Sequence, residues 1–300
     1  MLSIIVLGTA AGGGVPQWNC GCDNCRAART DHPELKATQA SIAVSADRQN
    51  WFLINASPDL RQQLADTPAL HPRALRHSPI AGVILTNGEV DAITGLLTLR
   101  EGSPFTLYGH ERVLSLLAEN SIFNVLKPTL VPRIAITPGT AFEPQLNDGT
   151  PSGLEILPFV TPGKVALFKE AEAANAEGDT LGFVIRDKAD GRGFVFLAAC
   201  AEITPEVASY LDGAGLVFFD GTLWKDDELI ALGLGQKTGQ RMGHIAMEAA
   251  IAAFDGLDVG RKFFLHINNS NPALQHGSPE RQALEQAGWQ IPADGMEITL

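Results

Sequence analysis

The stretch Gly82–Leu96, GVILTNGEVDAITGL, carries the signs of a buried strand, a polar loop and a helix in immediate succession. Its first part, Gly82–Thr86, is mostly apolar and precedes a turn, which is typical of a short strand. The apolar residues of Ile93–Leu99 recur at helical spacing. Between them lie Glu89 and Asp91, and polar residues in a loop that follows a strand often carry chemistry. This loop is therefore the first candidate for a functional site.

Strand and helix patterns of the same kind recur along the whole chain. The predicted strands are Ser3–Gly8, Ser41–Ser45, Trp51–Ile54, Gly82–Thr86, Thr106–Gly109, Leu154–Val160, Leu181–Ile185, Phe194–Ala198, Leu216–Asp220, Lys262–His266 and Glu297–Leu300. The predicted helices include Leu60–Ala65, Ile93–Leu99, Glu111–Asn120, Thr204–Leu211, His244–Ala253 and Pro279–Gln286. Early strands follow one another, whereas later strands alternate with helices. The order predicts an α/β fold in which two mixed sheets pack face to face with helices outside, a four-layer αββα sandwich in one domain over residues 1–300.

The composition is that of an ordered globular protein. Of the 300 residues, 45% are apolar and 19% are charged, which is enough apolar material for a sizeable core. The formal charge is −12, from 34 acidic and 22 basic residues. Because this charge repels a phosphate backbone on average, we expect no nucleic-acid partner.

The N-terminus MLSIIVLG has a short apolar run without a preceding positive region, so it is interpreted as a first strand and not as a signal peptide. No apolar run approaches the roughly 20 residues of a membrane span, so we expect no membrane partner. Four cysteines, three of them clustered, disfavour a disulfide scaffold. A reducing, cytoplasmic location is the expectation that follows.

Three of the cysteines lie in the stretch WNCGCDNC, residues 18–25. Thiolates of Cys20, Cys22 and Cys25 can converge on one ion, since Gly21 gives the loop backbone freedom. Zinc favours four tetrahedral ligands, and closed sulfur-rich sites are usually structural. We therefore predict a structural zinc site. On the residues alone, its fourth ligand is left open between Cys200, a histidine and an amide oxygen from a distant loop.

Six motifs occur in order along the chain: GTAAGGGVPQ (8–17), WNCGCDNC (18–25), NGEVDAITGL (87–96), VFFDGTLW (217–224), MGH (242–244) and HINNSNP (266–272). With these motifs the chain resembles the family of pyrroloquinoline quinone (PQQ) biosynthesis protein B, a branch of the metallo-β-lactamase superfamily. The resemblance covers essentially the whole length. The superfamily's αββα sandwich agrees with the fold predicted above.

The resemblance also shows where this chain departs from the wider superfamily. The signature His-x-His-x-Asp-His falls on Asn87, Glu89, Asp91 and Ala92, so that only the Asp is kept. The imidazoles that would hold two zinc ions are absent, which argues against a dinuclear zinc hydrolase. Fold alone does not assign the activity.

For this family, the resemblance implies a role in PQQ biosynthesis. The implied step is iron- and O2-dependent hydroxylation of the tyrosine ring of a Glu–Tyr cross-linked precursor derived from a peptide. The expected cofactors are Zn²⁺ at the structural site and Fe²⁺ at the active site, and a homodimer is the expected assembly. The alternatives are a PQQ carrier that acts in release or transport, and a residual metal-dependent hydrolase.

The active-site metal is predicted to bind Glu89, Asp91 and His266, because carboxylates and imidazole with open positions suit Fe(II). Asp220 and His244 are predicted as catalytic residues, either as further ligands or as groups that orient them. His244 can also act as an acid or base near neutral pH.

In related phosphodiesterases, a His-x-x-His places its second His on the cysteine-bound zinc, and that position is Asn269 here. The resemblance thus implies that the Asn269 side-chain oxygen is the fourth zinc ligand, with Cys200 as the alternative. An acidic substrate also needs cationic contacts, for which the candidates near the motif loops are Arg100, Lys164, Lys225 and Arg241.

Overall fold

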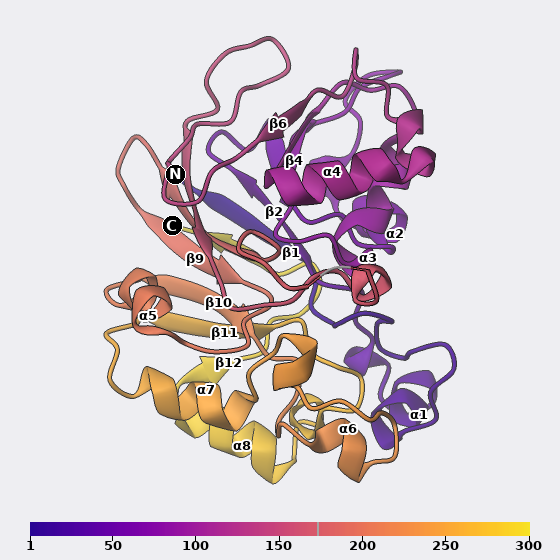
Figure 1. Ribbon diagram of the computed structural model, residues 1–300, viewed down its shortest axis with the longest axis vertical. Helices are drawn as coiled ribbons and strands as arrows, with labels where there is room; N and C mark the ends of the chain where they lie inside the picture. Colours follow the sequence, from indigo (N-terminus) through magenta and orange to yellow (C-terminus); the bar gives the residue numbers. More distant parts are fainter. Residues whose placement is uncertain (173) are drawn as a thin grey trace.

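Two β-sheets form the centre of the computed structural model, which describes residues 1–172 and 174–300 (Figure 1). Within these residues the first sheet has seven strands in the order β13-β1-β2-β3-β4-β5-β6, and the second has six in the order β12-β11-β10-β9-β8-β7. The first sheet contains β1 (Ser3–Gly8), β2 (Ser41–Ser45), β3 (Trp51–Ile54), β4 (Ile80–Ile84), β5 (Thr106–Gly109), β6 (Arg133–Ala135) and β13 (Glu297–Thr299). The second contains β7 (Leu154–Val160), β8 (Leu181–Asp187), β9 (Gly193–Leu197), β10 (Leu216–Asp220), β11 (Arg261–Leu265) and β12 (Trp289–Gln290).

Both faces of each sheet are covered. Successive side chains of a strand point to opposite faces, and in β1 Ile4 packs with the second sheet's Phe196 and Phe218, whereas Ile5 and Leu7 pack beneath helices. A third apolar cluster covers the outer face of the second sheet. Three buried clusters between four layers confirm the predicted αββα sandwich.

The helices lie on the outer faces. The α-helices are α1 (Asp23–Arg29), α2 (Leu60–Asp66), α3 (Val90–Ile93), α4 (Glu111–Glu119), α5 (Pro205–Leu211), α6 (Glu228–Ala231), α7 (Met247–Phe254) and α8 (Pro279–Gln286). Short 3₁₀ helices are η1 (Pro33–Leu35), η2 (Pro68–Leu70), η3 (Thr94–Leu99), η4 (Ser121–Val125), η5 (Leu167–Lys169), η6 (Gln240–Met242) and η7 (Pro272–Leu274). Apolar residues of α2, α3 and α4 pack on the first sheet, and those of α5, α7 and α8 pack on the second.

Local signals set several helix ends. At α5, the Thr204 side chain accepts a hydrogen bond from Val207 N, and Pro205 takes the first helical position, where no amide hydrogen is needed. At α8, Ser278 accepts from Arg281 N in the same way. These two helices therefore begin where the sequence pattern places them, to within one residue.

Other boundaries differ from the prediction. The strand predicted at Gly82–Thr86 is β4, two residues earlier, because the backbone amide of Thr86 is instead bound by the Asn55 side chain at 2.9 Å. The helix predicted from His244 begins at Met247, since His244 belongs to the preceding loop. The short edge strands β6 and β12, and the helices α1 and α6, have no counterpart in the sequence prediction.

The topology places the carboxyl ends of several strands together. Strands β3 to β6 run parallel in the first sheet, and β9 to β12 run parallel in the second. Ligands commonly bind beyond the carboxyl ends of parallel strands. The two termini lie together elsewhere, where Leu2 N donates to Leu300 O (Figure 1). Over the described residues, no helix has the length and apolar character needed to cross a membrane.

Candidate functional site

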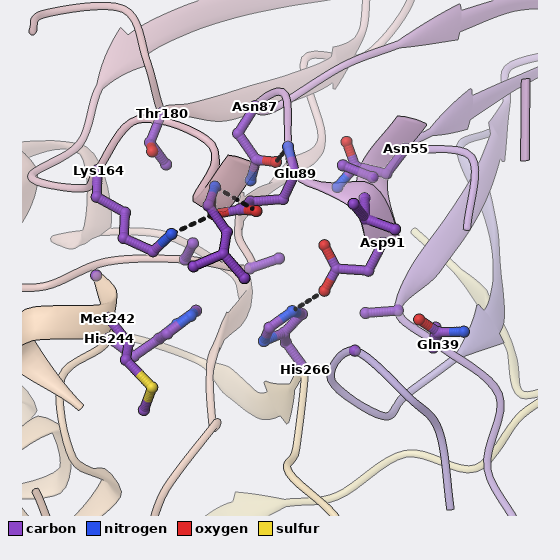
Figure 2. A pocket seen from close by; sticks show the side chains of 18 of the residues that line it. Gln39, Asn55, Asn87, Glu89, Asp91, Lys164, Thr180, Met242, His244 and His266 are labelled. Carbon is purple, nitrogen blue, oxygen red and sulfur yellow. Dashed lines mark hydrogen bonds and ion pairs between the residues drawn. The ribbon is translucent and has the colours of Figure 1, made fainter. Parts of the chain in front are cut away.

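A cavity of about 330 Å³ lies where the carboxyl ends of strands from both sheets meet (Figure 2). The first sheet contributes Glu89 and Asp91 from the loop and helix after β4. The second contributes His266, directly after β11, and the loop residue His244. The structure thus brings to one cavity four of the residues that the sequence selected for chemistry.

Asp91 and His266 are in direct contact, with Oδ2 of Asp91 2.8 Å from Nε2 of His266. Burial raises the pKa of Asp91, but the hydrogen bond and charge of His266 outweigh it, so that pKa lies below its ordinary value. Burial lowers the pKa of His266, but the hydrogen bond and charge of Asp91 outweigh burial, so that the pKa of His266 lies above its ordinary value. In the metal-free protein the two side chains therefore form an ion pair.

The backbone around this pair is specialised. His266 has φ +59°, a left-handed conformation that a residue with a side chain adopts at a cost. On the opposite side, a Cβ on Gly12 would lie 3.3 Å from Asp91 Oδ2, so glycine leaves room beside the carboxylate. Backbone strain of this kind is common at functional sites.

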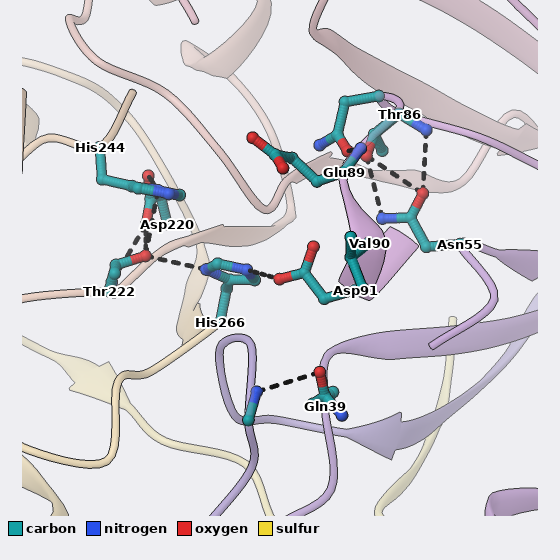
Figure 3. Close-up of polar contacts among 12 residues, drawn as sticks. Gln39, Asn55, Thr86, Glu89, Val90, Asp91, Asp220, Thr222, His244 and His266 are labelled. Atoms are coloured by element: carbon teal, nitrogen blue, oxygen red, sulfur yellow. Dashed lines mark hydrogen bonds and ion pairs between the residues drawn. The ribbon is translucent and has the colours of Figure 1, made fainter. Parts of the chain in front are cut away.

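Thr222 connects both histidines of the cavity (Figure 3). Its hydroxyl donates to Asp220 Oδ1 at 2.7 Å, so its lone pairs are left to accept from Nδ1 of His244 at 3.0 Å and Nδ1 of His266 at 2.9 Å. Hydrogen on each Nδ1 leaves Nε2 as the ligand atom of the neutral ring. Thr222 therefore favours this tautomer for His266, and for His244 it does so together with the closer Asp220 Oδ2, so that each Nε2 can bind a metal.

Asp220 is completely buried and fully hydrogen-bonded. Its Oδ1 accepts from the amide and hydroxyl of Thr222, and its Oδ2 accepts from Cys200 N at 2.9 Å and from His244 Nδ1 at 2.7 Å. One oxygen or nitrogen atom each of Asp220, His244 and His266 lies within 4.8 Å of the others. With its lone pairs taken, Asp220 is suited to orient His244 and Thr222.

The Glu89 carboxylate faces a different partner. It forms an ion pair with Lys164 Nζ and accepts from Leu167 N at 3.1 Å (Figure 2). Lys164 follows β7 on a turn at Gly163, where a Cβ would lie 2.3 Å from Thr180 Oγ1. Glu89 as a metal ligand stays a prediction, and in this structure its charge is balanced by a lysine.

The donor types of the cavity suit a divalent metal ion, but among the described residues the group whose donor atoms all lie within 4.8 Å of one another is Asp220, His244 and His266, without Asp91. Asp91, His266 and His244 lie in a row with His266 in the middle (Figure 3), and the two imidazole centroids are 5.1 Å apart. Two ligands bound at about 2.1 Å and at right angles are about 3 Å apart, close to the Asp91–His266 distance of 2.8 Å. Two imidazoles and one carboxylate with open positions are the set that non-haem Fe(II) oxygenases use.

The side chain of Asn269 lies against the three clustered cysteines, Cys20, Cys22 and Cys25. Asn269 Nδ2 lies 3.1 Å, 3.5 Å and 3.3 Å from the sulfur atoms of Cys20, Cys22 and Cys25. The sulfur atoms lie within 4.8 Å of one another, and a zinc tetrahedron with Zn–S bonds of about 2.3 Å needs about 3.8 Å. A half-turn of the amide exchanges Nδ2 for Oδ1, so Asn269 can offer oxygen to a zinc ion at this position.

Cys200 lies apart from this cluster. It is buried, its Sγ contacts Glu202 O at 3.1 Å, and burial raises its pKa to about 12. A thiol of this kind behaves as a small apolar side chain. Of the two predicted fourth ligands, the structure thus brings Asn269 to the cysteines and places Cys200 beside Asp220.

Comparison with known proteins shows which family this chain is similar to. Residues 50–267 match the family model described as a beta-lactamase superfamily domain. The coenzyme PQQ synthesis protein B of Bradyrhizobium diazoefficiens is 62% identical over 309 aligned residues, which span 100% of both chains. This chain belongs to the PQQ synthesis protein B family. The family assignment confirms the resemblance inferred from the sequence motifs.

Solved structures agree with this family. The crystal structure of Zn²⁺-bound PqqB from Methylobacterium extorquens has a TM-score of 0.93 and 43% identity, covering 99% of this chain and 100% of that one. A diphosphatase of the PhnP family has a TM-score of 0.71 at 20% identity, covering 100% of this chain and 98% of that one, and this likeness shows the fold alone.

Sequence reasoning missed two residues of this PQQ synthesis protein B site. Thr222 was only part of the motif VFFDGTLW, and its hydrogen bonds to His244 and His266 span 22 and 44 residues. Gly12 was not selected as a site residue, although it lies in the motif GTAAGGGVPQ. A signal for Thr222 did exist, since it follows Asp220 by two residues at a strand end.

Proposed function

We propose that this chain acts in the synthesis of coenzyme PQQ as an iron- and O2-dependent hydroxylase of a tyrosine ring. The proposed substrate is the Glu–Tyr cross-linked precursor, which carries several carboxylates. The observation that carries the proposal is the alignment of Asp91, His266 and His244 in one cavity, because two imidazoles and a carboxylate suit Fe(II) with positions left open.

The residues around these donors have orienting roles. Asp220 accepts hydrogen bonds from Thr222 and His244, and Thr222 holds the Nδ1 atoms of both histidines. Such partners fix the ring orientation and raise the basicity of the ligand nitrogen. In this proposal Asp220 therefore has a positioning role, whereas His244 contacts the metal.

The cavity also has apolar walls. Val90, Leu167 and Ala198 line it together with the polar groups. An aromatic ring that packs against these side chains would exclude water from the reacting carbon. The protein thereby places the ring and keeps the site dry, while the bound iron supplies the redox chemistry with O2.

The electron balance of the step requires a co-reactant. Insertion of one oxygen atom into an aromatic C–H bond, with the second atom leaving as water, consumes O2, two electrons and two protons. An external two-electron reductant must supply the electrons. A zinc ion held by Cys20, Cys22, Cys25 and Asn269 would have a structural role in this proposal, since these four residues would leave it no open position.

The proposal is tested with anaerobically purified protein loaded with Fe(II), the cross-linked precursor, a reductant and isotopically labelled O2. We expect O2 uptake and a product that carries one labelled oxygen on the tyrosine ring. Asp91→Asn and His266→Ala should lose this activity, and Lys127→Gln, which lines a separate cavity, should keep it.

Other results would redirect the assignment. Tight binding of PQQ without any turnover of the precursor would support a carrier. Hydrolysis of a phosphodiester with zinc or manganese, without oxygen incorporation, would support a hydrolase. Either result would overturn the hydroxylase.

A further inference from the structure

Lys164 is held between two carboxylates at the edge of the cavity. Its side chain is only 14% exposed, and Nζ contacts Glu89 (Figure 2). Nζ also lies 3.1 Å from Glu170 Oε1. Burial lowers the pKa of Lys164, but Glu89 and then Glu170 outweigh burial and raise it above its ordinary value. The side chain is therefore a buried, fully charged cation.

A second cavity of about 420 Å³ adjoins the first through Lys164, which lines both. Its wall also includes Glu170, Lys237 and Arg241. Glu170 pairs with Lys164 through one oxygen and with Lys237 through the other. The Lys164 side chain therefore lies at the boundary between the two cavities.

The three cations beside these cavities, Lys164, Lys237 and Arg241, are incompletely neutralised. Among the described residues, Arg241 forms no ion pair, whereas Lys164 and Lys237 share the single carboxylate of Glu170. Glu170 Oε1 is buried and accepts no hydrogen bond of good geometry. In a chain of formal charge −12, this cluster of three cations against Glu89 and Glu170 is a local positive centre. Such a centre attracts anions.

We propose that Lys164, Lys237 and Arg241 form a binding site for an organic polycarboxylate, and that a ligand carboxylate replaces Glu89 on Lys164. The ligand class rests on the proposed function, whose substrate is acidic. Charge-assisted hydrogen bonds from lysine and arginine to carboxylates are the contacts that such a ligand would form.

The exchange follows from the geometry of Glu89. Its carboxylate lies at the wall of the cavity, so it can leave Lys164 without a change of fold. Without Glu89, Lys164 would keep only Glu170, which it shares with Lys237. Because a partly neutralised charge in a largely buried position is unfavourable, a ligand carboxylate is expected to take the place of Glu89 on Lys164.

Binding of PQQ, a tricarboxylate, to the full-length protein tests the site by equilibrium dialysis or calorimetry without turnover. We expect Lys164→Met and Arg241→Gln each to weaken binding on the order of ten- to a hundredfold, as for loss of a charged hydrogen bond. Glu89→Gln should tighten binding, since the internal competitor is removed. Lys127→Gln, a cation in another cavity, is the matched control and should bind as the wild type does.

The double variant Lys164→Met/Glu89→Gln separates exchange from simple repulsion. If Glu89 acts through Lys164, then Glu89→Gln has no effect on PQQ affinity once Lys164 is replaced. An equal gain in PQQ affinity in the wild type and in Lys164→Met would overturn the exchange, because it would mean that Glu89 only repels the ligand. Wild-type affinity in Arg241→Gln and Lys164→Met, or no binding by the wild type, would overturn the site.

Failure of the site and failure of the hydroxylase give different results. PQQ binding that depends on Lys164 and Arg241, without oxygen incorporation, keeps the site and rejects the hydroxylase. Oxygen incorporation with an unchanged KM in both the Lys164→Met and the Arg241→Gln variant keeps the hydroxylase and rejects the site. Arg241→Gln breaks no ion pair among the described residues, so it tests the site even if Lys164→Met folds poorly.

Discussion

Nε2 of His266 lies 2.8 Å from Oδ2 of Asp91, a residue 175 positions earlier in the chain. His266 directly follows β11 of the second sheet, and Asp91 lies in α3 after β4 of the first. The contact therefore forms only when the two sheets have packed face to face. A metal bound by this pair would report on the packing of the whole sandwich.

The first prediction concerns the titration of this pair in protein from which the active-site ion has been removed. Because Asp91 outweighs burial, the pKa of His266 should lie above 6.5, and Asp91→Asn should lower it. NMR of the histidine ring protons measures this value. Asp179→Asn, whose carboxylate pairs with Arg112, should leave it unchanged.

The same pair predicts a pH dependence of stability for the ion-free protein. His266, with a raised pKa, contributes stability that is complete below pH 6.5 and is lost as pH rises through its folded pKa. Asp91, with a lowered pKa, contributes stability above pH 3.8 that is lost as pH falls through its folded pKa. The difference in Tm between wild type and Asp91→Asn should therefore be largest between these limits. A difference independent of pH would contradict the ion pair.

Thr222 should control metal affinity without contacting the metal. Thr222→Val removes the hydroxyl that holds both Nδ1 atoms, and loss of such a contact typically costs roughly ten- to a hundredfold in metal affinity. Thr222→Ser keeps the hydroxyl and should restore the affinity. Competition with a chelator of known affinity measures both variants. Equal affinity of Thr222→Val and Thr222→Ser would exclude this positioning role.

The cysteine site should lose its zinc when one thiolate is removed. Cys22→Ser should release the zinc and lower Tm by about 5 °C or more, since each kcal/mol costs about 2–4 °C in larger domains. Asn269→Ala should weaken zinc binding, and Asn269→Asp, which keeps an oxygen ligand, should retain it. Elemental analysis after dialysis measures the zinc. A Cys22→Ser protein with full zinc content and an unchanged Tm would exclude this site.

The thiols of the zinc-free protein should differ in reactivity. Burial raises the pKa of Cys20, but hydrogen bonds from Cys22 and its neighbours outweigh it and lower the pKa. Burial raises the pKa of Cys25 to about 11 and that of Cys200 to about 12. Because the thiolate is the reactive form, brief alkylation near pH 8 should modify Cys20 before Cys25, and Cys200 last. Mass spectrometry of the peptides measures the order, and zinc should protect Cys20. Equal rates in a folded, zinc-free protein would contradict it.

The sequence signals predicted what depends on neighbours in the chain. Asp91 and His266 were found because each follows an apolar strand, and strands are recognised from local composition. Cys20, Cys22 and Cys25 were found because their spacing is short. The sandwich itself followed from the order of strands and helices.

What the sequence did not reveal depends on loops far apart in the chain. Glu89 resembled a metal ligand because it lies two residues before Asp91, yet its partner Lys164 lies 75 residues away. That pairing depends on how the segment after β7 folds across the cavity. The hydrogen bond between Thr222 and His266 likewise forms only when β10 and β11 are adjacent.

The Glu89–Lys164 ion pair also has a consequence for selectivity. Since Glu89 is held beside Lys164 by the fold, it competes for Lys164 as an intramolecular partner, at an effective concentration set by the structure and not by the solution. A free monocarboxylate, such as an ordinary metabolite with one acid group, cannot match that concentration with one contact. Only a ligand that reaches Lys164 and Arg241 at once gains enough to displace the tethered acid. The Glu89 side chain would thus make the site selective for molecules with several acid groups.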